Sequence, residues 1–306
     1  MSDSTVNGSS APRASVDPAP EPSGAHADRY VVGYVANDRG RDALELAAFL
    51  ARGRDVELVV TIVVPHADAL IGARAIAAGS DRAVDEQVEA WLDEALALVP
   101  EGVRARGKRV VALTEAHGLL DAASEEGASL IVVGSRADGL MSRFAIGSVA
   151  SALLHAAHVP VALAPSGFAA TGGVERVTAV VGARPGASHL MSAAVQRALH
   201  RSVPVRVVEL VISGVGVRGD GRPAGLPRDD VRGEDVELVV HEGEGFDEAL
   251  EEVDWREGDL VLLGSSRIGA EHRVFLGRRA YRLLHAVSVP ALVVPRGYVG
   301  LGGEDE

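Results

Sequence analysis

At 306 residues the chain is long enough for two domains of about 150 residues, and its formal net charge of −13 at pH 7 disfavours nucleic-acid partners. It contains no cysteine, which excludes disulfides, a thiolate nucleophile and cysteine-liganded zinc. No stretch of about 18 apolar residues suggests a membrane span and no apolar signal segment opens the chain, so the sequence favours a cytoplasmic protein without a membrane partner.

The ends of the chain and one internal segment have compositions that are typical of tails and linkers. Residues 1–28 are rich in Ser, Ala and Pro and carry too little apolar surface to offset the entropy of ordering, so we predict a disordered tail. Two domains are expected over 29–166 and 174–298, with a glycine-rich linker over 167–173 and an acidic tail over 299–306.

The first domain alternates short apolar runs with segments of helical periodicity. The expected strands are 30–35, 56–64, 109–113, 130–134 and 161–164, and the later helices are expected at 81–99, 119–126 and 147–158. The strands are continuous apolar runs, which is typical of a parallel sheet covered by helices on both faces. The sequence therefore predicts an α/β fold with a doubly wound sheet.

The second domain repeats this series with one helix missing. Strands are expected at 177–181, 205–212, 236–240, 260–263 and 291–294, and helices at 190–199, 246–253 and 278–286. Between Ile212 and Asp235 the chain is rich in Gly, Arg, Pro and Asp, where the first domain has its helix at 81–99. We predict a shortened, partly disordered crossover there.

Residues 130–167 and 260–297 follow one pattern at a constant offset and without a gap. The shared positions include glycines, prolines and the string Leu-Leu-His-Ala, which begins at Leu153 and again at Leu283. A repeat unit of this length has room to bury its own core, so the duplication predicts two copies of one domain rather than a solenoid.

The first copy carries Gly134, Ala137, Gly147 and Ser148 in the spacing Gly-x2-Ala-x9-Gly-Ser. This resembles the Gly-x2-Gly-x9-Gly-Ser/Thr signature of nucleotide-binding members of the universal stress protein family. The resemblance covers nearly the whole chain, twice, and implies a tandem stress-response protein of a bacterium. It also implies two five-stranded parallel sheets of order 3-2-1-4-5, related by a pseudo-twofold axis, with ATP held at the switch point.

The same resemblance implies a nucleotide site in the first domain, for ATP or another adenine nucleotide with Mg. The implied residues are Val35, Asn37, Val63, Gly134, Ala137, Gly147, Ser148 and Val149. Glycines let phosphates approach the backbone, and the next helix offers free N–H groups at its positive end. Two departures stand against ATP, because Val35 replaces the usual aspartate and an alanine at 137 is strained if that position needs a positive φ.

The second domain departs further from the family signature. Arg267 and Arg278 replace the second glycine and the Ser/Thr, and with Arg184, Gly264 and Gly277 they mark a degenerate site. Two interpretations stay open. The arginines bind a different anion, or they fill the vacated pocket and pair with local carboxylates.

The apolar strands expected at 161–164 and 291–294 would lie at sheet edges, where an apolar strand needs a cover. The resemblance implies that they pair with each other antiparallel, so that one chain contains its own pseudo-dimer.

Two functions are compatible with these features of the sequence. One is a stress-response protein that binds an adenine nucleotide in the first domain, and the other is a nucleotide-independent regulatory or scaffold protein that acts through a protein partner. We find no paired nucleophile and base and no metal-ligand spacing, so no catalytic or metal residue is assigned and slow ATP hydrolysis is the one enzymatic option left.

Overall fold

The computed structural model describes residues 28–65, 80–138, 142–170, 172–182, 194, 202–212, 236–265, 274 and 276–295. The tails expected before residue 28 and after residue 298, the crossover expected between Ile212 and Asp235, and both Arg184 and Arg267 lie outside the described residues. Asp28 itself belongs to the first strand rather than to the tail.

The first half of the chain alternates strands and helices, as its apolar periodicity predicts. Its elements are β1 (Asp28–Gly33), α1 (Asp38–Ala51), β2 (Val56–Pro65), α2 (Ser80–Ala97), β3 (Arg104–Ala112), α3 (Glu115–Glu125), β4 (Leu130–Gly134), β5 (Arg136–Asp138), β6 (Ser142–Ala145), α4 (Ser148–Ala156) and β7 (Val161–Ala164). Two of these helices have a side-chain N-cap. Asn37 accepts a hydrogen bond from the Gly40 amide at the start of α1, and Thr114 accepts one from the His117 amide at the start of α3.

The second half repeats the alternation. Its elements are β8 (Arg176–Gly182), β9 (Val205–Ile212), β10 (Val236–Gly243), α6 (Phe246–Glu251), β11 (Asp259–Gly264), α7 (Arg278–Ala286) and β12 (Ala291–Val294). The α/β class and the duplication are therefore confirmed.

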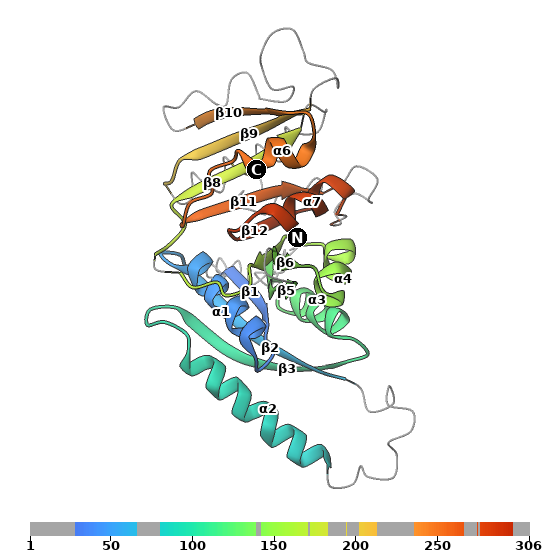
Figure 1. Ribbon diagram of the computed structural model, residues 1–306. Helices are drawn as coiled ribbons and strands as arrows, with labels where there is room; N and C mark the ends of the chain where they lie inside the picture. Colours follow the sequence, from blue (N-terminus) through green and yellow to red (C-terminus); the bar gives the residue numbers. More distant parts are fainter. Residues whose placement is uncertain are drawn as a thin grey trace, which may run out of the picture.

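One ten-stranded sheet runs through both halves, in the order β10-β9-β8-β11-β12-β7-β4-β1-β2-β3 (Figure 1). Neighbouring strands are parallel within each half. In the middle of the sheet β12 runs antiparallel to β7, with Leu292 opposite Ala162. These apolar strands cover each other, and the sheet edges fall on β3 and β10 instead.

Helices cover both faces of the sheet, and each face has its own apolar core. One core joins α1 and α2 to the sheet and includes Leu46 and Val88. The other joins α3, α4, α6 and α7 and includes Leu119, Leu153 and Leu283. Both cores contain strand residues from both halves, so the halves share their interior.

The structure corrects the expected boundary of the third strand. β3 begins at Arg104, before the apolar run at 109–113, because it is an edge strand whose charged side chains find partners. Arg106 pairs with Glu57 at 3.4 Å, and the Lys108 ammonium donates to Glu126 at 2.7 Å.

A second correction concerns the segment between β4 and α4, where no secondary structure is expected from the sequence. Strands β5 and β6 form a separate antiparallel pair there, with a register shift between Arg136 and Asp138. The pair is short and mostly polar, so it has no apolar periodicity by which it could be predicted.

The expected linker is attached to the first half at its start. The Gly167 amide donates to the Asp42 carboxylate at 2.9 Å, and Phe168 packs edge-to-face on Phe49 of α1 with ring centroids 5.6 Å apart. Gly167 has a φ of +71°, which glycine adopts without strain. Burial raises the pKa of Asp42, although the Gly167 amide opposes that shift.

Candidate functional site

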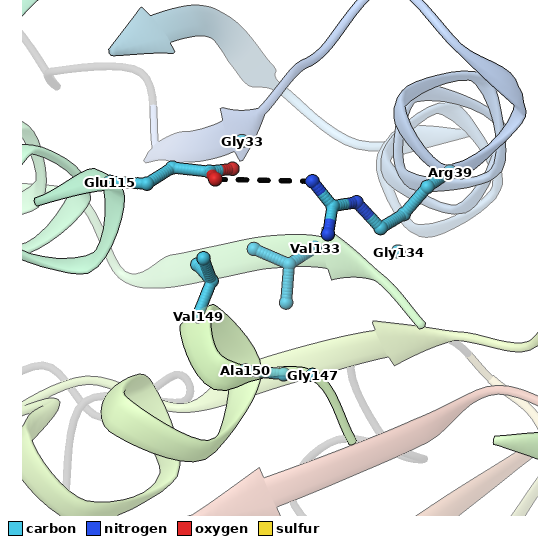
Figure 2. A pocket seen from close by; sticks show the side chains of 8 residues that line it. All are labelled: Gly33, Arg39, Glu115, Val133, Gly134, Gly147, Val149 and Ala150. Atoms are coloured by element: carbon cyan, nitrogen blue, oxygen red, sulfur yellow. Dashed lines mark ion pairs between the residues drawn. The ribbon is translucent and has the colours of Figure 1, made fainter. Parts of the chain in front are cut away.

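A crevice lies at the carboxyl ends of β1 and β4, which are neighbours in the sheet (Figure 2). From β1 the chain continues to α1 on one face, and from β4 it continues towards α4 on the other, so this is the switch point of the first half. The crevice is partly open to solvent. Its lining residues are Gly33, Arg39, Glu115, Val133, Gly134, Gly147, Val149 and Ala150.

Close backbone approaches shape the crevice. A Cβ atom at Gly134 would lie 2.0 Å from the backbone oxygen of Arg39, so only glycine lets the first turn of α1 reach the end of β4. Gly40 is equally restricted, because a Cβ there would lie 1.9 Å from the Val35 oxygen. These two glycines set the position of α1 beside the crevice.

Helix α4 begins at the crevice. Gly147 is its N-cap, with φ −68° and ψ 172°, and no side chain caps this end. Val149 and Ala150 of the first turn line the crevice, whereas the Ser148 side chain is exposed. The first amides of an α-helix have no intrahelical partner and lie at its positive end, so this terminus suits an anion.

One pair of opposite charges spans the crevice. Arg39 of α1 and Glu115 of α3 approach to 3.9 Å between Nη2 and Oε2, and their side chains are 29% and 31% exposed. Figure 2 shows the two side chains pointing toward each other between Gly33 and Val133. Sequence reasoning missed both residues, although each occupies the first turn of a helix that follows a parallel strand, which is where such sites form.

The other residues implied by the sequence are not among the lining residues of the crevice. Val35 and Asn37 form the turn before α1, where the Asn37 amide donates to the Val35 oxygen at 2.7 Å and the Asn37 side chain caps the helix. Val63 of β2 packs against Gly118 of α3. Ala137 lies within β5, where extended backbone accommodates alanine, so the expected strain does not arise.

The second half keeps the backbone features of this site. Gly264 ends β11, and Gly277 is the N-cap of α7 with φ −78° and ψ 162°, close to the angles of Gly147. Arg278 is the first residue of α7. The two halves thus present equivalent helix N-termini, one followed by serine and the other by arginine.

Strand register reveals a further difference between the halves. Tyr30 pairs with Leu130 in the first half, and Val177 pairs with Leu260 in the second. Tyr30 and Val177 are therefore equivalent positions. Three residues further along each strand, the first half has Gly33 and the second has Val180. A valine side chain, packed against the second core, therefore stands at the position that is open in the first half.

Within the part of the chain that the structure describes, no three His, Asp or Glu side chains gather closely enough to hold a metal ion. The described helices also include none with the length and apolar character needed to cross a membrane.

Comparison with known proteins identifies relatives of nearly the full chain. The model of the universal stress protein family matches residues 27–165 and 222–295. Universal stress proteins of Mycobacterium tuberculosis and Mycobacterium bovis are 33% identical over 297 residues, which span 87% of this chain and 99% of each relative. A universal stress protein from Archaeoglobus fulgidus, 18% identical with a TM-score of 0.62, covers 89% of this chain and has the same fold over 100% of its own.

Proposed function

The chain belongs to the universal stress protein family, and from that premise we propose that its first half binds an adenine nucleotide, ATP in particular. The observation that carries the proposal is the crevice at the switch point, where Gly33, Gly134 and Gly147 meet the uncapped N-terminus of α4. We assign the second half no nucleotide, because Val180 and Arg278 replace Gly33 and Ser148 at the equivalent positions.

The proposed arrangement follows from the polarity of the crevice. The phosphates lie against Gly134 and Gly147 and accept hydrogen bonds from the first amides of α4, with the Ser148 hydroxyl as a further donor. The nucleoside extends toward the turn that holds Val35 and Asn37 and toward the end of β2 at Val63. Mg would enter as a counterion of the phosphates.

We propose a binding role without turnover. Glu115 is the only acidic side chain among the eight residues that line the crevice, and phosphoryl transfer needs a positioned nucleophile and a metal-binding set. Nucleotide binding then acts as a signal in the stress response, read out through a protein partner.

Isothermal titration of ATP into the full chain tests the proposal, with one substitution in each half. Gly147→Asp places a carboxylate where the phosphates lie, and aspartate is a favourable N-cap, so α4 should still form. Gly277→Asp is the matched control, because Gly277 has the same extended backbone at the N-cap of α7. We expect Gly147→Asp to weaken ATP binding by at least tenfold, roughly the cost of one unfavourable charge contact, and Gly277→Asp to leave it unchanged.

Two results would contradict the proposal. One is the absence of heat for the unaltered protein at millimolar ATP. The other is an equal loss of binding in both variants, which would place the nucleotide elsewhere or indicate a general effect of added negative charge.

A further inference from the structure

We propose that Arg39 is the charged side chain that binds the phosphates, and that Glu115 pairs with Arg39 in the empty crevice and competes with the phosphates for it. This inference rests on the proposed function and makes it specific. It makes the site selective for ligands that carry phosphate, because an uncharged nucleoside has nothing with which to displace Glu115.

The backbone fixes Arg39 in place. Its carbonyl oxygen lies against Gly134, and its own Cγ would be 2.9 Å from a Cβ at that glycine. The start of the side chain is therefore anchored at the end of β4, and the guanidinium extends across the crevice toward α3 (Figure 2). Arg39 is also the one basic side chain among the lining residues.

Helix ends make the position of Arg39 unfavourable unless an anion faces it. Arg39 occupies the first turn of α1, where the positive end of the helix repels a cation. Glu115 occupies the first turn of α3, where the same effect favours an anion. The N-termini of α1, α3 and α4 and the Arg39 guanidinium therefore all contribute positive charge at the crevice. Glu115 is the one carboxylate among the lining residues.

The contact between the two side chains is loose enough to be exchanged. The closest atoms are 3.9 Å apart, beyond hydrogen-bond distance, and both side chains are about one-third exposed. Partly exposed pairs of this kind contribute little to stability. A phosphate offers the guanidinium a bidentate partner with more charge, so it replaces Glu115 without a large cost.

The competition predicts opposite effects of neutralising the two partners. Glu115→Gln removes the competitor and should tighten binding of phosphate ligands, whereas Arg39→Gln removes the binding group and should weaken it. The double variant separates competition from a general structural effect. Once Arg39 is gone, the gain from Glu115→Gln should disappear.

Titration calorimetry with ATP, inorganic tripolyphosphate and adenosine tests this on the full chain. We expect Glu115→Gln to tighten ATP and tripolyphosphate about threefold to tenfold and Arg39→Gln to weaken both by about tenfold or more, with adenosine unaffected by either. Glu86→Gln is the control, because it removes the carboxylate of an exposed ion pair with Arg82 on α2, and neither residue lines the crevice.

Each outcome decides between the two proposals. If ATP binds but Arg39→Gln does not weaken it, the role of Arg39 is wrong and the nucleotide site stands. If tripolyphosphate binds through Arg39 but ATP does not bind, the nucleotide function is wrong and the anion site stands. If Glu115→Gln changes adenosine and tripolyphosphate alike, competition for phosphate is wrong. If no variant binds any of the three ligands, both proposals fail.

Discussion

The two halves share a sheet order and both cores, yet they differ at both ends of their strands. The first half has its crevice at the carboxyl ends, floored by Gly33 and Gly134. The second half fills the position of Gly33 with Val180 and carries a buried charge cluster, Arg176, Arg206 and Asp259, near the amino ends of its strands. The same backbone fold therefore accepts either polar or apolar side chains at the ends of its strands, provided that each buried charge has partners.

Of the three charged residues, only Arg176 has a charged counterpart in the first half, Arg29, which pairs with the more exposed Glu57 at 3.5 Å. By register Arg206 takes the place of Val59, and Asp259 takes the place of Ser129. Arg176 donates to both oxygens of Asp259, at 2.6 and 2.8 Å, while the Arg206 guanidinium lies over the Trp255 ring. Burial and the nearby Arg176 lower the pKa of Arg206.

The largest effect is expected from breaking this cluster. Asp259→Ala leaves two guanidinium groups without their shared carboxylate, one of them in a side chain only 5% exposed, and should cost about 3–5 kcal/mol of unfolding free energy. The equivalent change in the first half, Ser129→Ala, should cost about 1 kcal/mol, because it leaves no charged group without a partner. Urea unfolding of both variants measures the difference, and similar losses would mean that the cluster is not a special feature of the second half.

A smaller effect is expected from giving the first half the side chain of the second. A Cβ at Gly33 would lie 2.9 Å from Leu119 Cδ1 and 3.1 Å from Val133 Cγ1, so Gly33→Val should cost about 1–3 kcal/mol. It should also abolish ATP binding, because its methyl groups enter the crevice. Val180→Ala is the control and should leave binding intact at a cost of about 1 kcal/mol. A folded Gly33→Val protein with normal ATP affinity would contradict the location of the site.

The smallest effect concerns the more exposed charges of the first half, at the edge strand β3. The hydrogen bond from Lys108 holds the pKa of Glu126 below its ordinary value, with Arg106 adding to the shift. Stability from Glu126 is thus present above about pH 4.5 and is lost as the pH falls through its lowered pKa.

Unfolding midpoints between about pH 7 and pH 3 measure this contribution. Glu126→Gln should be less stable at pH 7 and should lose less stability on acidification. Glu125→Gln is the control and should change the profile less, because that carboxylate is 65% exposed. Parallel pH profiles for Glu126→Gln and the unaltered protein would show that the Glu126 pairs do not contribute.

The sequence predicts the strands well where they are buried on both faces. The runs at 161–164 and 291–294 are apolar throughout, and the structure begins and ends β7 and β12 at those residues. Prediction fails where charge is compensated by a distant partner. The segment from Arg104 to Lys108 is too highly charged to be predicted as a strand. Its charges are compensated by Asp55, Glu57 and Glu126, which only the fold brings beside it.

Some residues of the candidate site could also be predicted from the sequence, and others could not. Gly134 and Gly147 could be predicted because a family signature marks them, and both line the crevice together with Val149, which follows the signature by one residue. Arg39 and Glu115 could not, because their helices are far apart in the sequence and only the parallel sheet brings their first turns together. Gly33 carries no local signal either, since its importance depends on its neighbour β4.

The antiparallel contact of β7 with β12 has an evolutionary consequence. In a symmetric assembly of two identical chains, every substitution appears twice, so a change that removes one ligand site removes both. Here the two partners of the central contact are consecutive parts of a single polypeptide, and each position can vary alone. The second half has Val180 and Arg206 where the first half has Gly33 and Val59, so one half can differ from the other while both still contribute to the shared interior.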